Sequence, residues 1–293
     1  MYDIEALYEA GSVSQAIALL QEHPGARIIA GGSDVLIRVR EGRLAGCVLV
    51  SIQKLDAIRG ISLDPDETIR IGALTCFSRI ACNPVIQRRI PVLGEAADTV
   101  GGPQIRNIAT IGGNICNGVS SADSASTLLA WDAVLEYSGP KGIRLVPIGN
   151  HFMGPGKTAL NRDELLTAIL IPKESYTDYY GHYIKYAMRN AMDIAVLGCS
   201  VNVRLSQDKK TFRDLRIAYG VAGPAPLRAP EAEGNARGRP VNWETAETLG
   251  KAVIKEISPR SSPRASREFR LHLAEELAKR ALRQAVTKAG GTL

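Results

Sequence analysis

Two pairs of glycines stand among residue types that can bind phosphate groups. The first pair lies in the segment Ala30-Gly31-Gly32-Ser33-Asp34, directly after an apolar run at residues 27–30 that predicts a buried strand. Ser33 or Asp34 can cap a short helix from residue 35 to about residue 40. Glycines between a strand and a helix let the backbone approach a phosphate, to which the start of the helix offers free N–H groups. A tight turn without any ligand fits the same residues, so both interpretations stay open at this point.

The second pair lies in Thr110-Ile111-Gly112-Gly113-Asn114, within a long stretch that has no charged residue and no histidine. Neutral side chains that donate and accept hydrogen bonds surround it, and Asp123 follows it: Asn107, Asn114, Asn117, Ser120 and Ser121. Such groups, together with bare backbone, suit a pyrophosphate that is held without covalent chemistry. We therefore expect residues 101–121 to form a long loop that a ligand orders. The alternative is a compact surface Ω-loop.

Other motifs that could carry chemistry are weak. The segment Gly154-Pro155-Gly156-Lys157-Thr158 ends like a P-loop, but His151 occupies the position of the first glycine of that motif. The same glycines fit a loose dinucleotide fingerprint, yet Pro155 removes an N–H group that this fingerprint needs. We find no nucleophile elbow and no convincing acid–base pair, and we predict no catalytic residue on this chain.

The cysteines and histidines do not form a metal-binding pattern. No C-x-x-C pair occurs, and the cysteine spacings match neither zinc nor iron–sulfur ligands: Cys47, Cys76, Cys82, Cys116 and Cys199. The four histidines lie far apart in the sequence. We predict reduced structural thiols and no metal site.

Composition and charge indicate a folded chain with a basic end. Of the 293 residues, 45% are hydrophobic and 23% are charged, as in ordinary globular proteins. The net charge of +6 lies entirely within residues 251–293. A basic helix there can contact nucleic acid, a membrane surface or an acidic partner, or it can face only solvent. No nucleic-acid motif occurs, so docking of a partner subunit around residues 260–270 explains the charge better.

The location of the protein is also suggested by the sequence. The N-terminus has no basic and then apolar segment of the kind that starts a signal peptide. The longest uncharged stretch is too short and too polar to cross a bilayer. We expect a cytoplasmic protein that binds neither membrane nor nucleic acid.

Residue patterns predict a compact βαβ unit followed by mixed helices and strands. Ser12 starts a pattern typical of a capping box before a helix at residues 13–21. Strands at 27–30 and 47–52 flank the helix at 35–40, which implies a parallel pair. We expect a hairpin at 58–63 and 68–74, further helices at 75–81, 91–100, 125–131, 243–257 and 265–288, and further strands at 133–137, 144–148, 183–188, 195–205 and 215–221. Residues 173–180 are predicted as a linker and residues 223–240 as a loop.

Taken together, the motifs resemble the FAD-binding subunit of the molybdenum hydroxylases, a family that includes xanthine dehydrogenase, aldehyde oxidase and aerobic carbon monoxide dehydrogenase. The two glycine segments have the order and spacing of that family. Residues 184–195 look like the start of the family's C-terminal domain, and residues 218–229 look like its next strand and loop. Residues 114–124 and 259–273 are most similar to the separate flavin subunit of bacterial xanthine dehydrogenases.

The resemblance implies an α+β fold of three parts. Residues 1–55 and 56–175 would form the two subdomains of an FAD-binding domain like that of vanillyl-alcohol oxidase. Residues 176–293 would form an α+β C-terminal domain like that of the carbon monoxide dehydrogenase flavoprotein.

The resemblance also implies which residues bind FAD. The first segment would hold the pyrophosphate from one subdomain with Arg27, Ile28, Ile29, Ala30, Gly31, Gly32, Ser33, Asp34 and Val35. The second would hold it from the other with Thr110, Ile111, Gly112, Gly113, Asn114 and Asn117. Asp123 falls at the family's acidic contact, Leu166 at an apolar contact and Lys185 at a basic one. Val100 stands where the animal enzymes carry an aromatic ring stacked on the flavin, so stacking by an aromatic ring is not expected here.

The function implied is an electron relay. A purine would be hydroxylated at a molybdopterin cofactor on one partner subunit, and electrons would pass through two [2Fe–2S] clusters on another. FAD on this chain would collect two electrons and reduce NAD⁺. Lys185 could stabilise reduced anionic flavin or form a structural ion pair. The alternatives are a related aldehyde, nicotinate or carbon monoxide dehydrogenase and, from another class, a basic nucleic-acid-binding module.

Overall fold

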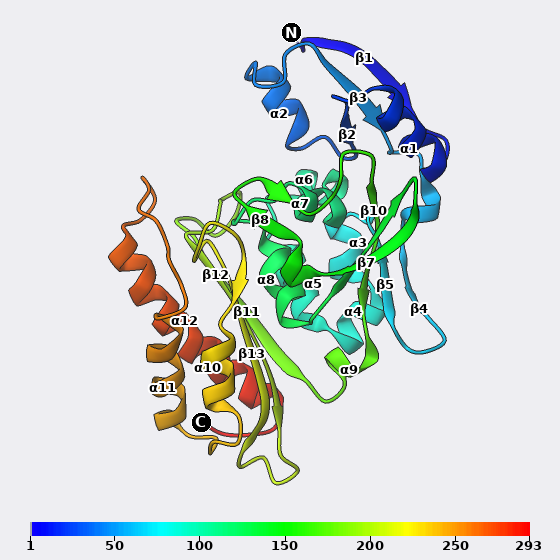
Figure 1. The fold of residues 1–293 in the computed structure, drawn as a ribbon. Coiled ribbons are helices and arrows are strands. Elements are labelled where there is room, and N and C mark those ends of the chain that lie inside the picture. The colour runs from blue at the N-terminus through cyan, green and yellow to red at the C-terminus, as the bar shows by residue number, and fades with distance from the viewer. Residues whose placement is uncertain (1) are drawn as a thin grey trace.

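The computed structural model describes residues 2–293. The chain forms three units that follow one another in sequence (Figure 1). The N-terminal unit lies at one end, the middle unit carries most of the short helices, and the C-terminal unit packs along the side of the middle unit. The prediction of an α+β fold is confirmed. The division at residues 55 and 175 stays a proposal, since the first hydrophobic core also includes Leu74 and Leu165.

The N-terminal unit is a three-stranded parallel sheet with two helices. Its elements are β1 (Ile4–Glu9), α1 (Val13–Glu22), β2 (Arg27–Ile29), α2 (Val35–Arg40) and β3 (Cys47–Ser51), with strand order β1-β3-β2. The predicted βαβ unit is confirmed, because β2 and β3 pair in parallel. Ser12 caps α1 by accepting a hydrogen bond from the Gln15 backbone N–H at 3.1 Å. The sequence analysis missed β1, whose residues are half-buried to exposed.

The middle unit has a five-stranded antiparallel sheet with helices packed on it. In chain order its elements are η1 (Asp56–Ile58), β4 (Ile61–Leu63), β5 (Ile69–Gly72), α3 (Phe77–Cys82), α4 (Pro84–Arg89), α5 (Pro91–Asp98), α6 (Pro103–Ile108), α7 (Ile111–Cys116), α8 (Asp123–Ala130), β6 (Val134–Gly139), β7 (Gly142–Pro147), η2 (Ile148–Asn150), β8 (Phe152–Gly154), β9 (Lys157–Thr158) and β10 (Leu165–Ile171). The strand order is β4-β5-β10-β6-β7. The predicted hairpin is confirmed, because β4 pairs with β5. The central strand, β10, was not predicted. All seven residues of β10 are buried, so it lacks the alternation that indicates a strand.

The expectation of a long loop at residues 101–121 is wrong. Two short helices, α6 and α7, occupy much of this segment. Pro103 begins α6, at a position where its missing N–H costs nothing. Thr110 caps α7 by accepting a hydrogen bond from the Gly113 N–H at 3.1 Å. A proline at the start of α6 and the cap of α7 therefore help to order a segment whose glycines and asparagines are typical of loops.

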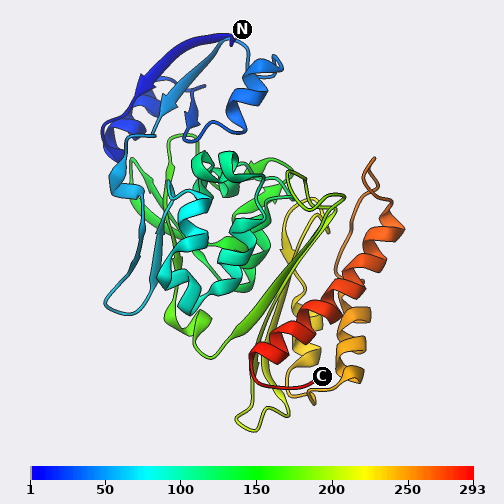
Figure 2. The ribbon, with the colours of Figure 1, turned by 180° about the vertical axis from the view of Figure 1, so that it is seen from behind.

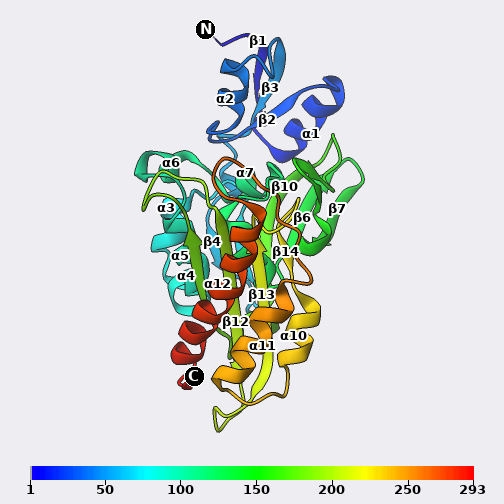
Figure 3. The same ribbon diagram turned by 90° about the vertical axis from the view of Figure 1, so that its left-hand side faces the viewer.

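The C-terminal unit is a four-stranded antiparallel sheet covered by helices on both faces. In chain order it contains α9 (Lys173–Tyr176), β11 (Tyr180–Tyr186), β12 (Leu197–Leu205), β13 (Phe212–Gly220), β14 (Leu227–Arg228), α10 (Pro230–Ala236), α11 (Trp243–Val253) and α12 (Arg267–Lys288). Helix α12 packs on one face, while α5 and α8 of the middle unit pack on the other. Figure 2 shows the strands between these two helical layers, and Figure 3 shows α12 in front of the strands.

Two expectations for this unit are wrong. The predicted linker at residues 173–180 contains α9, and the side chains of its residues Tyr176 and Tyr179 are buried in the protein. The predicted loop at residues 223–240 contains β14 and α10. Buried tyrosines anchor the first element, and a proline begins the helix of the second. The polar composition of one segment and the Pro/Gly-rich composition of the other do not reveal these elements.

The P-loop-like segment forms a hairpin instead of a phosphate loop. Gly154 ends β8, Lys157 and Thr158 form β9, and no helix follows the glycines. His151 is fully buried beside this hairpin. Its ring contacts the Tyr137 hydroxyl and, at 3.1 Å, the Ile115 carbonyl oxygen. Burial lowers the pKa of His151, which keeps this histidine neutral and structural.

Among residues 2–293, no helix is both long enough and apolar enough to cross a membrane.

Candidate functional site

The fold brings the first glycine segment against the end of α6, directly before the second segment. A Cβ atom added to Gly31 would lie 1.9 Å from the carbonyl oxygen of Ile108, at the end of α6. No side chain fits in that space, so a glycine is needed where the N-terminal unit meets the middle unit. Gly32 has a positive φ of 73°, which also favours glycine. Segments far apart in the sequence thus form one site.

The first segment presents a run of backbone donors without acceptors. The N–H groups of residues 31–35 donate to no acceptor within the part of the chain that the structure describes. The carbonyl groups of Gly32 and Asp34 do accept helical bonds, from Leu36 at 3.0 Å and Arg38 at 3.2 Å. Consecutive free N–H groups in a turn form a concave site for an anion. The residues present therefore fit a pyrophosphate at this segment.

The second segment uses its backbone donors internally. Ile111 donates to the Thr75 carbonyl oxygen at 3.0 Å, and Gly112 donates to that of Ala73 at 2.9 Å. Gly113 donates to the Thr110 hydroxyl. A Cβ atom on Gly112 would lie 2.7 Å from Ala73, so this glycine serves close packing. A ligand here would be held by side chains, and the backbone of Thr110–Gly113 has little to offer it.

The side chains of Asn114 and Asn117 are well placed to act in that way. Asn114 Oδ1 accepts a hydrogen bond from the Ser124 hydroxyl at 2.7 Å, which leaves its NH₂ group as a donor. Asn117 Oδ1 accepts one from the guanidinium group of Arg38, in α2. The Arg38 contact also ties the N-terminal unit to the middle unit.

A buried charged pair joins the middle and C-terminal units next to these loops. Lys185 Nζ lies 2.8 Å from Asp123 Oδ2 and donates to the Thr99 carbonyl oxygen at 2.9 Å. The Tyr183 hydroxyl donates to Asp123 Oδ1 at 3.1 Å. Burial raises the pKa of Asp123, and the neighbouring Lys185 and Tyr183 partly offset this rise. The predicted acidic and basic contacts therefore form one cluster.

The two predicted apolar positions lie in the core of the middle unit. Val100 follows α5, directly after Thr99, and Leu166 belongs to β10. Both side chains are buried within the chain itself.

Sequence reasoning missed two residues of this region, Tyr183 and Arg38. The alternation along β11 could have indicated Tyr183, because it shares a strand face with Lys185. Nothing in the sequence indicates that Arg38 reaches Asn117, which is 79 residues away.

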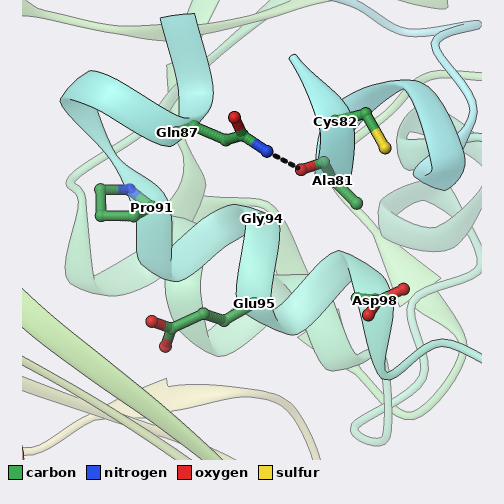
Figure 4. A pocket seen from close by; sticks show the side chains of 7 residues that line it. All are labelled: Ala81, Cys82, Gln87, Pro91, Gly94, Glu95 and Asp98. Carbon is green, nitrogen blue, oxygen red and sulfur yellow. Dashed lines mark hydrogen bonds between the residues drawn. The ribbon is translucent and has the colours of Figure 1, made fainter. Parts of the chain in front are cut away.

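A separate pocket of about 400 Å³ lies between α3, α4 and α5 (Figure 4). Its lining includes the carboxylates of Glu95 and Asp98 and no basic side chain. Such a lining repels phosphate, so this pocket does not suit a dinucleotide. Within residues 2–293, no group of three or more His, Cys, Asp or Glu side chains could hold a metal ion.

The basic surface around residues 260–270 is smaller than expected. Arg270 is buried, and its guanidinium group donates to the Val196 carbonyl oxygen at 3.1 Å and to the Ser262 hydroxyl at 2.8 Å. It holds the start of α12 against β12 and is not available for docking. Arg260, Arg264 and Arg267 are exposed.

Comparison with known proteins identifies the family. Residues 2–174 match the family described as the FAD binding domain in molybdopterin dehydrogenase, and residues 182–285 match the CO dehydrogenase flavoprotein C-terminal domain. The chain is 44% identical over its full length to the full length of a putative xanthine dehydrogenase FAD-binding subunit, XdhB, of Escherichia coli K12. It is 30% identical to the carbon monoxide dehydrogenase medium chain of Hydrogenophaga pseudoflava, over 94% of each chain.

A solved structure agrees with this assignment. Carbon monoxide dehydrogenase from Hydrogenophaga pseudoflava contains a chain similar to this one, with a TM-score of 0.93 and 30% identity, covering 98% of this chain and 99% of that one. The resemblance drawn from the glycine segments is confirmed, and the chain belongs to the family of FAD-binding subunits of molybdenum hydroxylases.

Proposed function

We propose that this chain is the FAD-binding subunit of a xanthine dehydrogenase and relays electrons from [2Fe–2S] clusters of a partner subunit to NAD⁺. The observation that carries the cofactor part of this proposal is the run of unpaired N–H groups at residues 31–35, in a segment that lies against the end of α6. Similarity to a xanthine dehydrogenase subunit over the whole of both chains supports the substrate.

The residues of the site would each have a distinct task. The N–H groups of residues 31–35 bind the pyrophosphate, flanked by Arg27, Ile28, Ile29 and Ala30. The amides of Asn114 and Asn117 supply further donors, and Thr110, Ile111, Gly112 and Gly113 hold these amides in place. Asp123 and Lys185 form the charged part of the site, and Val100 and Leu166 its apolar part. When bound, FAD supplies the chemistry of accepting two electrons and passing a hydride to NAD⁺.

The partners in this proposal are an iron–sulfur subunit and a molybdopterin-binding subunit. Substrate oxidation would occur at the molybdopterin cofactor, which explains why this chain needs no acid–base pair of its own. Two of the relatives are named as a medium chain and as a subunit of a dehydrogenase complex, which supports a multi-subunit assembly. A cytoplasmic location, with access to NAD⁺, belongs to the same proposal.

The second candidate is a related dehydrogenase with another substrate. The nicotinate dehydrogenase FAD-subunit of Eubacterium barkeri is 31% identical over 84% of this chain. The glyceraldehyde dehydrogenase medium chain of Sulfolobus acidocaldarius is 29% identical. Both identities are well below the 44% found with the xanthine dehydrogenase subunit, which favours xanthine.

The test is reconstitution of the complex with and without this chain. Complete complex is expected to reduce NAD⁺ when xanthine is supplied, and the isolated chain is expected to release FAD on heating. Complex that lacks this chain should still oxidise xanthine with an artificial dye that takes electrons from the iron–sulfur clusters, but it should not reduce NAD⁺. Equal NAD⁺ reduction without the chain contradicts the relay, and activity with nicotinate but not xanthine favours the second candidate.

A further inference from the structure

The strand β11 presents one set of side chains to the middle unit and another to its own unit. Tyr183 and Lys185 point toward α5 and α8, where Tyr183 belongs to the core of the middle unit. Ile184, between them, packs into the core of the C-terminal unit. Alternation along a strand requires this division. Two neighbouring groups of the C-terminal unit therefore reach the carboxylate of Asp123 from one side.

The ammonium group of Lys185 has one donor to spare. Of its three N–H groups, one is directed to Asp123 Oδ2 and one to the Thr99 carbonyl oxygen. Residues 2–293 supply no third acceptor for it. The side chains of Lys185 and Asp123 are only 9% and 10% exposed, so solvent has limited access to this last donor. An unpaired donor on a buried charge is costly unless a ligand accepts from it.

The hydroxyl of Tyr183 fixes the other oxygen of the same carboxylate. With both oxygens engaged, the Asp123 carboxylate cannot rotate, and the direction of its bond to Lys185 is set. Gly198 leaves room for this arrangement, because a Cβ atom there would lie 3.0 Å from the Tyr183 hydroxyl oxygen.

We propose that Tyr183 is a positioning residue of the cofactor site, which acts through Asp123 to hold the free donor of Lys185 ready for the bound FAD. This inference rests on the proposed function, since it requires FAD at the site. It adds a residue that neither the glycine motifs nor the comparisons assign. The C-terminal unit would thereby orient the ammonium group of Lys185, which lies among residues of the middle unit.

The test compares Tyr183→Phe with a matched control, Tyr219→Phe, in the full chain. Tyr219 is also fully buried, and its hydroxyl donates to the Ala274 carbonyl oxygen at 2.9 Å in the core against α12, away from the site. FAD affinity is measured by titrating each cofactor-free chain with FAD. We expect Tyr183→Phe to weaken binding by about tenfold, as for a lost hydrogen bond to a charged group, and Tyr219→Phe to change it less than about twofold.

A pH profile separates positioning from a merely structural role. The titratable groups that face this carboxylate are Lys185 and Tyr183 of β11; Cys199 of β12 lies near Tyr183 but belongs to the core on the other face of the sheet. Protonation of Asp123 breaks its pair with Lys185, so FAD binding should weaken as the pH falls through the pKa of Asp123. The Tyr183 hydroxyl stabilises the ionised carboxylate, so in Tyr183→Phe this acid limb should lie at higher pH. Tyr219→Phe should keep the wild-type profile.

Two further variants test whether Tyr183 acts through Asp123. In an Asp123→Asn background, the Tyr183→Phe change should weaken FAD binding much less than it does alone. Gly198→Ala, which crowds the hydroxyl without removing it, should weaken FAD binding by about twofold to threefold.

The inference is wrong if Tyr183→Phe binds FAD with wild-type affinity and pH profile, or if its effect on FAD binding adds fully to that of Asp123→Asn. Either result would leave FAD binding by the chain itself intact. A wild-type chain that does not bind FAD overturns the proposed function and the inference together.

Discussion

The two glycine segments have similar residues and different roles. At residues 31–35 the backbone N–H groups are unpaired, whereas at residues 111–113 each N–H has an acceptor within the chain. The difference comes from the surroundings: the carbonyl groups of Ala73 and Thr75 accept hydrogen bonds from the second segment, whereas the Ile108 carbonyl beside Gly31 accepts none from the first. A glycine pair thus indicates that another group can come close to the backbone. The surrounding residues decide whether that group belongs to a ligand or to the protein itself.

The sharpest test of this difference is Gly31→Ala. The new methyl group would overlap the Ile108 carbonyl, so the loop must shift away from the middle unit. FAD affinity should fall by on the order of a hundredfold, because each lost hydrogen bond to a charged group costs about 1.5–3 kcal/mol. Titration of the cofactor-free chain measures this loss. Gly25→Ala is the control, since a Cβ there meets no atom within 4 Å, and equal affinities for the two variants would contradict the assignment.

In the second segment the expected effect of such a change is on stability. Gly112→Ala places a methyl group 2.7 Å from Ala73 and should lower the free energy of unfolding by about 1–3 kcal/mol. Gly113→Ala meets only the Thr110 hydroxyl at 3.0 Å, and the higher helix propensity of alanine should compensate. Urea unfolding of both variants measures the difference. If Gly113→Ala is the more damaging change, the packing role given to Gly112 is wrong.

The side chains of the second segment should matter more than those of the first. Asn117→Ala removes an amide donor and the contact with Arg38, and it should weaken FAD binding by about fivefold to tenfold. The measurement is the same FAD titration, with circular dichroism to verify folding. Unchanged affinity would mean that the amide of Asn117 faces solvent in the complex.

The smallest effect is expected for Ser33→Ala in the first segment. Its backbone N–H remains, so FAD affinity should change by less than about threefold if backbone groups do the binding. A loss as large as that of Asn117→Ala would remove the contrast between a backbone site and a side-chain site.

The sequence predicted those parts of the fold whose signals are local. The helix at 35–40 and the parallel pair around it follow from a short apolar run and glycines, and the structure confirms them, but the expected capping bond from Ser33 or Asp34 is not made. Strand β10 was missed because its seven buried residues do not alternate, and α7 was missed because its cap, Thr110, lies among loop-forming residues. Burial and tertiary contact decide such segments, and composition alone does not reveal them.

For the site, the sequence located the two glycine segments but not the groups with which they and the charged residues form hydrogen bonds and ion pairs. It placed Asp123 and Lys185 as separate contacts, and the structure joins them as a pair. It also treated both glycine segments as phosphate loops, since the acceptors that occupy the second lie some 40 residues earlier in the chain. Pairings between distant residues depend on the packing of whole units, which no local pattern encodes.

The position of Lys185 late in the chain has a consequence for biosynthesis. Gly31, Asn114 and Asp123 leave the ribosome before it, and until β11 has formed, the Asp123 carboxylate lacks both of its donors. The same strand must be held from behind by α12, which is the last helix to be made. The nascent chain can therefore assemble its glycine loops early, yet the charged part of the site forms only when synthesis is nearly complete. Under the proposed function, cofactor loading is thereby tied to the completion of β11 and α12.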